Sequence, residues 1–325
     1  MSSSPSPFPS PRMRNEGTRP FLARAARLSP EDAYGMALAL DRARAPQREP
    51  GHRLYWMTGT TFGSRDVPAT RSGFAVLGRH TQCDGVLDDD PSLALRHLLV
   101  RSACLDDGLP MLSVMDLRSH EGFELSDGTE QRSILATGPV VLRVGVCAVV
   151  ALPSGEPPAL SLPIPVCTSI DAHPYRIMAR PVGPDPVARP ALVSRITLLP
   201  RASMVSEPSR TGGSASGGAG EYELFLRSPG GHAGVRLSAQ DLAHGVLVGR
   251  ALKCVDAGLR AVLDSGISRV HALLLRDRNG CFAYDTASTQ GTYHDGHAVR
   301  CVPLHPEGTR FYLGTCGVQA YWRAV

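Results

Sequence analysis

Short apolar or alternating runs fill the chain from about residue 52 to the C-terminus, and clusters of Gly, Asp, Asn and Pro separate them. Alternation with a period of two is the pattern of a half-buried strand, and turn residues at short intervals between such runs are typical of an all-β sandwich. We expect two sets of strands, the first at 54–57, 74–77, 98–101, 112–116 and 140–152, and the second at 195–199, 222–227, 246–249, 272–276, 282–285, 310–313 and 317–322.

One helix is expected ahead of the strands. Ser29 supplies an N-cap, Pro30 suits the first helical position, and Glu31 and Asp32 place acidic groups in the first turn. The helix is predicted to end near Ala45-Pro46. An isolated helix of this length is marginal in water, so it either docks on a domain or is partly frayed. Residues 1–20 are rich in Ser, Pro and Arg and are predicted to be disordered.

The chain length of 325 residues fits two domains of ~150 residues each. Residues 151–210 contain 12 of the 27 prolines, which predicts a semi-extended spacer. We therefore divide the chain into a disordered segment with a short helix at 1–50, a sandwich at 52–153, a Pro-rich linker at 154–191 and a second sandwich at 192–325. A flexible Gly/Ser-rich loop at 211–220 is expected to lie between 195–199 and 222–227, which are predicted to pair as the first hairpin of the second sandwich.

The two sets of strands repeat one another. Each contains a Gly-Arg pair, a histidine 18 or 21 residues after that arginine, a loop that begins with aspartate, and an Asp-Gly pair, in the same order. Self-similarity of this kind predicts a duplicated domain. The residues concerned are Gly78-Arg79, His97, Asp116 and Asp127-Gly128 in the first set, and Gly249-Arg250, His271, Asp285 and Asp295-Gly296 in the second.

Composition excludes several classes of protein. Hydrophobic residues make up 42% and charged residues 20% of the chain, which is ordinary for a globular protein, and the net charge of +4 is too diffuse for a dedicated nucleic-acid surface. The most apolar run, 140–152, is interrupted by Arg143 and is too short to span a bilayer, so no membrane association is expected. The eight cysteines form no C-x-x-C pair and follow no secretory leader, which predicts reduced thiols in a cytoplasm.

An enzymatic interpretation has little support. Ser268, His271, Asp285 and His294 are the residue types of a nucleophilic triad, but no Gly-x-Ser-x-Gly elbow accompanies them, and alternation on a strand directs Ser268 and His271 to opposite faces. The sequence has no phosphate-cradling P-loop, and its histidines and cysteines lack the spacing of metal ligands. We therefore predict neither catalysis nor a cofactor or metal.

Three motifs in the second set resemble the forkhead-associated (FHA) family: Gly249-Arg250, Ser268-Arg269-Val270-His271, and the loop from Asp285 to Thr292. Singly, an arginine after a strand is usually a solvated surface residue, and Ser-Arg at a strand entrance is usually turn chemistry. The three motifs together, in the order that the family has, are far more specific than any one of them alone. The resemblance covers about residues 192–325, and it implies a β-sandwich that binds phosphothreonine peptides through loops at one end.

A phosphothreonine brings about two negative charges and several acceptor oxygens, so a binder needs charge-assisted donors held at the bases of loops. Arg250 directly follows a predicted strand and is the expected anchor, with Gly249 leaving room for close backbone approach. Ser268 is expected to donate its hydroxyl to the same phosphate, and Arg269 to add a second guanidinium. Three such hydrogen bonds at ~1.5 to 3 kcal/mol each are enough for micromolar binding after the costs of association.

The resemblance implies the remaining roles. Thr289 is expected to help hold the phosphate, and Gln290 stands where the family usually has an asparagine that fixes the peptide backbone. His271 is expected to brace the loops rather than touch the ligand, and Gly291 to be structural. For Lys253, on the adjacent loop, free hydration is favoured over phosphate contact.

The first set retains the scaffold but loses most donors. Gly78, Arg79, His97, Asp116 and Gly122 remain, which predicts an intact fold. A methyl group cannot donate a hydrogen bond, and a carboxylate repels an incoming dianion. We therefore expect structural support or phosphate-independent docking in place of phosphothreonine binding. The replacements are Ala94 for Ser268, Leu95 for Arg269, His120 for Thr289, Glu121 for Gln290 and Phe123 for Thr292.

These features predict a non-enzymatic cytoplasmic adaptor that binds a Thr-phosphorylated protein or peptide through its C-terminal sandwich. The resemblance implies that a Ser/Thr protein kinase creates the ligand. The alternative is a structural interaction protein in which neither site binds phosphate. A further hypothesis is self-ligation, because Thr18 and Thr211 lie in segments predicted to be flexible, where the effective concentration of a tethered ligand reaches ~millimolar values.

Overall fold

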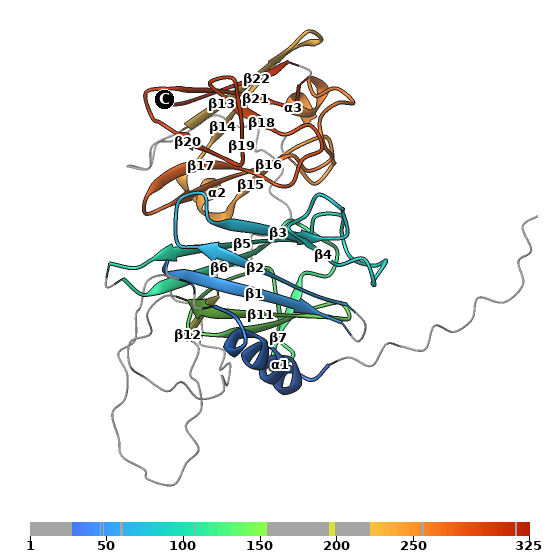
Figure 1. Ribbon diagram of the computed structural model, residues 1–325. Coiled ribbons are helices and arrows are strands. Elements are labelled where there is room, and N and C mark those ends of the chain that lie inside the picture. The colour runs from blue at the N-terminus through green and yellow to red at the C-terminus, as the bar shows by residue number, and fades with distance from the viewer. Residues whose placement is uncertain are drawn as a thin grey trace, which may run out of the picture.

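The computed structural model describes residues 28–45, 47, 49–58, 61–106, 108–154, 195–198, 222–254, 257–315 and 317–325. Within these ranges the chain forms two β-sandwiches, as the sequence predicts (Figure 1). The predicted disordered N-terminus, most of the Pro-rich linker, the Gly/Ser-rich loop, and Thr18 and Thr211 lie outside the described residues.

The first sandwich consists of two six-stranded sheets. One has the order β2-β1-β11-β10-β7-β8 and the other β12-β9-β6-β5-β3-β4. Their inner faces enclose a core of aliphatic side chains that includes Leu54, Leu98 and Val149. The strands are β1 (Gly51–Met57), β2 (Phe62–Pro68), β3 (Phe74–Gly78), β4 (Gly85–Val86), β5 (Leu98–Cys104), β6 (Pro110–Asp116), β7 (Phe123–Leu125), β8 (Glu130–Gln131), β9 (Ser133–Thr137), β10 (Val140–Val144), β11 (Cys147–Ser154) and β12 (Arg195–Leu198).

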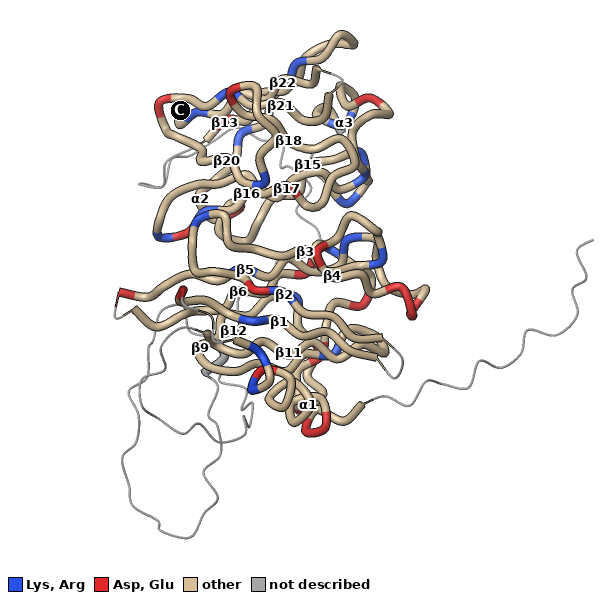
Figure 2. The backbone as a smooth tube through the Cα atoms, viewed as in Figure 1, with Lys and Arg blue, Asp and Glu red and all other residues tan. Residues whose placement is uncertain are grey.

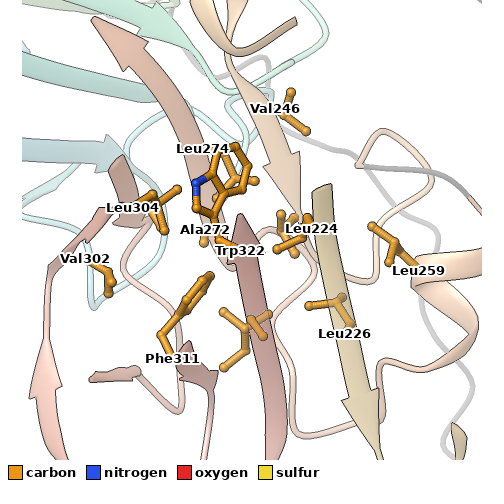
Figure 3. Packing of buried hydrophobic residues seen from close by; sticks show 14 of the residues in the cluster. Leu224, Leu226, Val246, Leu259, Ala272, Leu274, Val302, Leu304, Phe311 and Trp322 are labelled. Atoms are coloured by element: carbon orange, nitrogen blue, oxygen red, sulfur yellow. The ribbon is translucent and has the colours of Figure 1, made fainter. Parts of the chain in front are cut away.

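The second sandwich packs a six-stranded sheet, β14-β13-β22-β21-β18-β19, on a four-stranded sheet, β15-β16-β17-β20. Trp322 lies fully buried in the core between the sheets, together with Phe311 and Leu224 (Figure 3). The strands are β13 (Tyr222–Ser228), β14 (Gly231–Leu237), β15 (Val246–Val248), β16 (Ala272–Asp277), β17 (Gly280–Asp285), β18 (Thr292–His294), β19 (His297–Val299), β20 (Cys301–Leu304), β21 (Thr309–Leu313) and β22 (Val318–Ala324). Two short helices, α2 (Ala239–His244) and α3 (Ala257–Ala261), are absent from the sequence prediction.

The predicted N-terminal helix is α1 (Pro30–Arg42), which ends a few residues before the predicted position. Ser29 caps it and accepts a hydrogen bond from the Asp32 amide at 3.1 Å. The helix packs its buried residues, Ala33, Tyr34 and Ala37, against the outer face of β1, β10 and β11. At its last turn the Asp41 carboxylate accepts hydrogen bonds from Arg53 at 3.0 Å and from the Tyr55 hydroxyl at 2.8 Å. The helix is therefore docked rather than frayed.

The strand at 195–198 has a different partner from the predicted one. It pairs antiparallel with β9 and so extends a sheet of the first sandwich. The partners of β13 are β14 and β22, so the predicted hairpin between 195–199 and 222–227 is wrong. Local alternation marks a strand but does not specify its partner, which is set by contacts distant in sequence. The domain boundaries themselves remain predictions.

The two sandwiches share their loop geometry. The amide of Arg79 donates to the Ala94 carbonyl at 3.2 Å, and the amide of Arg250 donates to the Ser268 carbonyl at 3.2 Å. The Leu117 amide donates to the His97 carbonyl at 2.8 Å, and Thr286 donates in the same way to His271 at 3.0 Å. Equivalent positions in the two sequence repeats therefore make equivalent hydrogen bonds.

The sandwiches pack against each other through one sheet of each. The face of β3, β5 and β6 in the first sandwich lies on the face of β15, β16 and β17 in the second (Figure 1). The apolar centre of this contact includes Phe74 against Tyr284, with ring centroids 5.1 Å apart in an edge-to-face arrangement. Its other buried members are Val76, Cys83, Leu99, Met115 and Leu117 from the first sandwich, and Leu247, Cys254, Val270, Leu273, Leu275 and Phe282 from the second.

Charged pairs join the two sandwiches around the apolar centre. Arg101 pairs with Asp277, Arg300 pairs with Asp84, and Arg278 lies 3.2 Å from Asp106. Basic and acidic residues from both sandwiches accordingly occur along the boundary in Figure 2. Among the helices of the described ranges, none has the length and apolarity needed to cross a bilayer.

Candidate functional site

Arg250 lies two residues after the end of β15, at the start of the loop that leads to α3. Its side chain is exposed, and its Nε donates to the Ile267 carbonyl, which fixes the guanidinium at the base of the loop. Within the described residues this partner is a carbonyl and not a carboxylate, so the positive charge of Arg250 is not neutralised by an acidic side chain. The exposed, uncompensated charge is what an anion site requires.

The glycine before Arg250 is required by its surroundings. A Cβ at Gly249 would lie 2.5 Å from the Arg269 carbonyl oxygen, which is far below van der Waals contact. Because the contact is with backbone, no side-chain rotation can relieve it. The first loop can therefore approach the second closely only with glycine at this position.

Ser268 is buried, with 7% of its surface exposed, and its hydroxyl links the second and third loops. The Thr289 amide donates to the Ser268 Oγ at 2.9 Å, and the Ser268 hydroxyl donates to the Thr289 Oγ1 at 3.4 Å. The structure thus brings together two residues that the sequence proposed for the same phosphate. Ser268 also has a loop-linking contact that was not predicted.

His271 lies beneath both residues and is fully buried. Its Nδ1 accepts from the Ser268 amide at 3.3 Å, so the proton is on Nε2, which donates to the Gly291 carbonyl at 3.0 Å. Burial lowers the pKa of His271, while the Asp285 carboxylate, 3.9 Å away, opposes the shift. A neutral imidazole bonded to both loops has the geometry of a brace.

The third loop, 285–292, is held by the Asp285 carboxylate. This group accepts hydrogen bonds from the Ser288 amide at 2.7 Å, the Ser288 hydroxyl at 2.6 Å and the Thr292 hydroxyl at 2.7 Å. The bonds from Ser288 form an Asx-type turn, for which the Asp-x-x-Ser spacing is the sequence signal. Sequence reasoning did not assign Ser288 or Thr292 to this scaffold. Gly291 follows in the left-handed region, with φ of 73°.

The remaining predicted site residues surround this centre. Thr289 and Arg269 are exposed, and Gln290 is half-buried. The Gln290 Oε1 accepts a hydrogen bond from the Thr315 hydroxyl at 2.7 Å, which fixes the side-chain amide. An amide whose oxygen is engaged still carries its NH₂ donors, and these are available for a peptide carbonyl. The roles of these residues toward phosphate and peptide remain predictions.

The prediction for Lys253 is wrong. Its Nζ donates to the carbonyls of Leu117 and Arg118 in the first sandwich, at 2.8 and 2.9 Å. Burial lowers the pKa of Lys253, and the nearby Asp116 carboxylate opposes that shift. The lysine is therefore neither freely hydrated nor a phosphate ligand; it joins the two sandwiches. A lysine in a polar loop gives no sequence signal of a partner in another domain.

The equivalent place in the first sandwich keeps the arginine and loses the link between the loops. Arg79 donates through Nε to the Leu93 carbonyl, as Arg250 does to Ile267. Ala94 has no hydroxyl to join the third loop. Leu95 is 39% exposed. His120 and Glu121 are exposed, and no structural feature of the described residues replaces the missing donors.

The third loop of the first sandwich keeps the turn in which the Ser119 amide donates to the Asp116 carboxylate, at 3.0 Å, and it is held in addition by Arg132. This side chain donates to the carbonyls of Ser119 and His120, each at 2.7 Å, and to the Asp116 carboxylate at 2.8 Å. The guanidinium is therefore engaged by three acceptors of its own sandwich. It stabilises the loop and is not directed at a ligand.

The structure does not assemble a nucleophilic triad from Ser268, His271, Asp285 and His294. The Ser268 hydroxyl contacts Thr289, and the imidazole nitrogen nearest to Ser268 accepts its backbone amide instead of its hydroxyl. His294 lies 3.4 Å from Asp295. No group of three or more potential metal ligands occurs among the described residues.

The model of the FHA domain family matches residues 246–314, which contain all three motifs. The second sandwich thus includes an FHA domain, and FHA domains are modules that bind phosphothreonine peptides. The match covers the loops described above and leaves the first sandwich outside it. No curated protein matches the chain significantly.

Solved FHA domains are similar to this chain in structure. The FHA-1 domain of Mycobacterium tuberculosis Rv1747 is 25% identical, and the alignment covers 32% of this chain and 96% of that domain with a TM-score of 0.25. The FHA domain of the CT664 protein from Chlamydia trachomatis is 16% identical over 31% of this chain and 95% of that domain, with a TM-score of 0.26. These TM-scores are low, and the family assignment rests on the match at 246–314.

Proposed function

We propose that this protein is a non-enzymatic adaptor that binds a Thr-phosphorylated protein through the loops of its second sandwich. The observation that carries the proposal is the exposed Arg250 guanidinium, which pairs with no carboxylate among the described residues. It comes after Gly249, the glycine that permits close approach of the loops. Ser268 and Thr289 are already joined beside it. Arg269 supplies a second exposed guanidinium next to Ser268.

The charge pattern favours a phosphate over a neutral ligand. Arg250 and Arg269 are both exposed, and the carboxylate of the third loop, Asp285, is occupied by hydroxyl and amide donors of its own loop. A phosphate dianion at this place therefore meets two exposed guanidinium groups, while the Asp285 carboxylate is already engaged by donors of its own loop. Each hydrogen bond to a charged group contributes ~1.5 to 3 kcal/mol, and a bidentate arginine provides two.

The proposed ligand requires a Ser/Thr protein kinase as its source, and we place the adaptor in the cytoplasm, where such kinases act on their clients. Every cysteine among the described residues is a free thiol, which supports a reducing compartment. The first sandwich is proposed not to bind phosphate, because it has Ala94 at the position where Ser268 supplies a hydroxyl in the second sandwich.

The test is a titration of the full-length protein with a phosphothreonine peptide library, degenerate at three positions on each side, and with its unphosphorylated form. The wild type is expected to bind only the phosphorylated pool. Arg250→Ala removes two charge-assisted hydrogen bonds and is expected to weaken binding by about 100-fold or more. Arg79→Ala, the matched change in the first sandwich, is expected to leave affinity unchanged.

Other outcomes have definite meanings. Equal binding by wild type and Arg250→Ala excludes the assigned site. Loss of binding in Arg79→Ala alone moves the site to the first sandwich. Absence of binding by either pool supports the alternative, a scaffold that docks its partners without phosphate.

A further inference from the structure

Both third loops contain a residue other than glycine in the left-handed region of backbone space. Ala287 has φ of 59° and Arg118 has φ of 53°, and each lies two residues after the aspartate that begins its loop. A residue with a Cβ disfavours this conformation by ~1 to 2 kcal/mol. The surroundings must therefore stabilise the turn.

In each case a cation of the other sandwich binds the carbonyl of the left-handed residue. Arg96 of the first sandwich donates through Nε to the Ala287 carbonyl at 2.9 Å, and its Nη2 donates to the same oxygen. Lys253 of the second sandwich donates to the Arg118 carbonyl at 2.9 Å. Arg118 returns a hydrogen bond to the Lys253 carbonyl at 2.7 Å. The two contacts are reciprocal across the interface between the sandwiches.

Arg96 has no equivalent within the second sandwich. It precedes His97, and the residue before His271 is Val270, whose apolar side chain packs into the same interface. Only 5% of the Arg96 surface is exposed, so its guanidinium is enclosed by the contact and is not itself accessible to a peptide. A buried charge is tolerated where acceptors meet it, and the Ala287 carbonyl is the acceptor observed here.

The turn at Ala287 directly precedes the residues that form the site. Ser288 closes the Asx-type turn on Asp285, and Thr289 donates its amide to the Ser268 hydroxyl. A rotation of the peptide at Ala287 would displace both residues together, because they follow it without an intervening flexible position. The carbonyl that Arg96 holds and the Ser288 amide that Asp285 holds belong to the same peptide, so Arg96 and Asp285 together fix the orientation of the peptide that leads to Thr289.

We infer that the first sandwich is a positioning part of the phosphate site, in which Arg96 holds the third-loop turn that places Thr289 and Gln290. This inference rests on the proposed function of the second sandwich. It gives the degenerate repeat a definite role: it supplies no phosphate donor and sets the geometry of the loop that does.

The experiment compares Arg96→Met with Arg101→Met in the full-length protein. Arg101 is the matched control, because it is equally buried and pairs with Asp277 across the same interface, but it does not contact the third loop. Arg96→Met is expected to weaken binding of the phosphothreonine peptide library by about 10-fold, the value for one charge-assisted hydrogen bond. Arg101→Met is expected to lower thermal stability while leaving affinity within about twofold.

Hydrogen exchange of the backbone amides at 288–290 gives a readout that needs no ligand. Arg96→Met is expected to accelerate exchange at these amides, and Arg101→Met is not. Arg96→Lys keeps the positive charge on one donor nitrogen and is expected to show a smaller change in both affinity and exchange. If Arg96→Met does not fold, Arg96→Lys carries the comparison.

Two results would overturn the inference. One is wild-type affinity and wild-type exchange at 288–290 in a folded Arg96 variant. The other is an equal effect of Arg101→Met, which would indicate general loosening of the interface. If the wild type binds no phosphothreonine peptide, the proposed function fails, and the exchange comparison still decides whether Arg96 holds the loop.

Discussion

The contact between the sandwiches predicts a large and specific effect of Phe74→Ala. Phe74 is 2% exposed, packs edge-to-face on Tyr284 of the other sandwich, and has the Arg300 guanidinium 4.5 Å from its ring centroid. Truncation of a buried phenylalanine costs ~3 to 5 kcal/mol. Because Phe74 lies on the interface face of β3 and outside the inner core of the first sandwich, we expect the loss to fall on docking.

The chain provides a reporter for each sandwich. It contains two tryptophans, Trp56 in the first sandwich and Trp322 in the second, so Trp56→Phe and Trp322→Phe each leave one fluorophore. Docked sandwiches stabilise each other, so within each single-tryptophan protein the fluorescence transition in urea is expected to coincide with the loss of far-UV circular dichroism. With Phe74→Ala added, the free energy of docking falls by ~3 to 5 kcal/mol, and the two transitions are expected to separate.

The control is Phe62→Ala, which removes the same ring from a position that is 49% exposed on the first sandwich. We expect this change to cost less than about 1 kcal/mol and to leave the two transitions together. Coincident transitions in Phe74→Ala, or a loss no greater than that of Phe62→Ala, would refute the interface as described.

Further changes test the loop geometry, the buried histidine and the helix. Gly249→Ala places a Cβ 2.5 Å from the Arg269 carbonyl oxygen and is expected to lower the free energy of unfolding in urea by ~1 to 3 kcal/mol. The control is Gly230→Ala, whose Cβ meets no atom closer than 3.6 Å and is expected to have little effect. Burial lowers the pKa of His52 to about 3, so between this pH and about 6.5 the unfolded chain binds a proton that the folded chain excludes. The free energy of unfolding is therefore expected to fall as the pH drops from about 6.5 toward 3. In His52→Asn this fall is expected to be less steep when unfolding is measured across that range. Ala37→Glu introduces a carboxylate at a fully buried position of α1, and the helix is expected to undock and become sensitive to protease, while an unchanged digestion pattern would contradict its docking on the sheet.

The sequence was sufficient for those features that are encoded locally. Alternating runs predict the strands, the Ser29-Pro30 signal predicts the helix, and the order of landmarks predicts the duplication, because each depends on residues close together in the chain. The residues proposed around Arg250 also come together, since Ser268 and Thr289 lie in loops at the ends of neighbouring strands and are joined by a hydrogen bond.

Features that depend on partners distant in sequence were missed. The strand at 195–198 was assigned to the wrong neighbour, and Lys253 to solvent, although each has its partner in the first sandwich. One signal of the interface was present in the sequence. The runs 98–100 and 273–275 are continuously apolar, and in the structure every residue of both is buried, which an antiparallel strand with one solvent face would not show.

The interface also explains how a repeat can lose its ligand donors without losing its fold. Docking requires the first sandwich to present a rigid sheet face and a fixed second loop, and His97 braces that loop through the Gly122 carbonyl at 2.7 Å, as His271 does in the other sandwich at 3.0 Å. Docking does not require a hydroxyl at Ala94 or an amide at Glu121. The contacts across the interface are also not equivalent, because the first sandwich contributes Arg96 and the second contributes Lys253. The two sandwiches are therefore not interchangeable, and the duplicated fold acts as one asymmetric unit with a single candidate phosphate site.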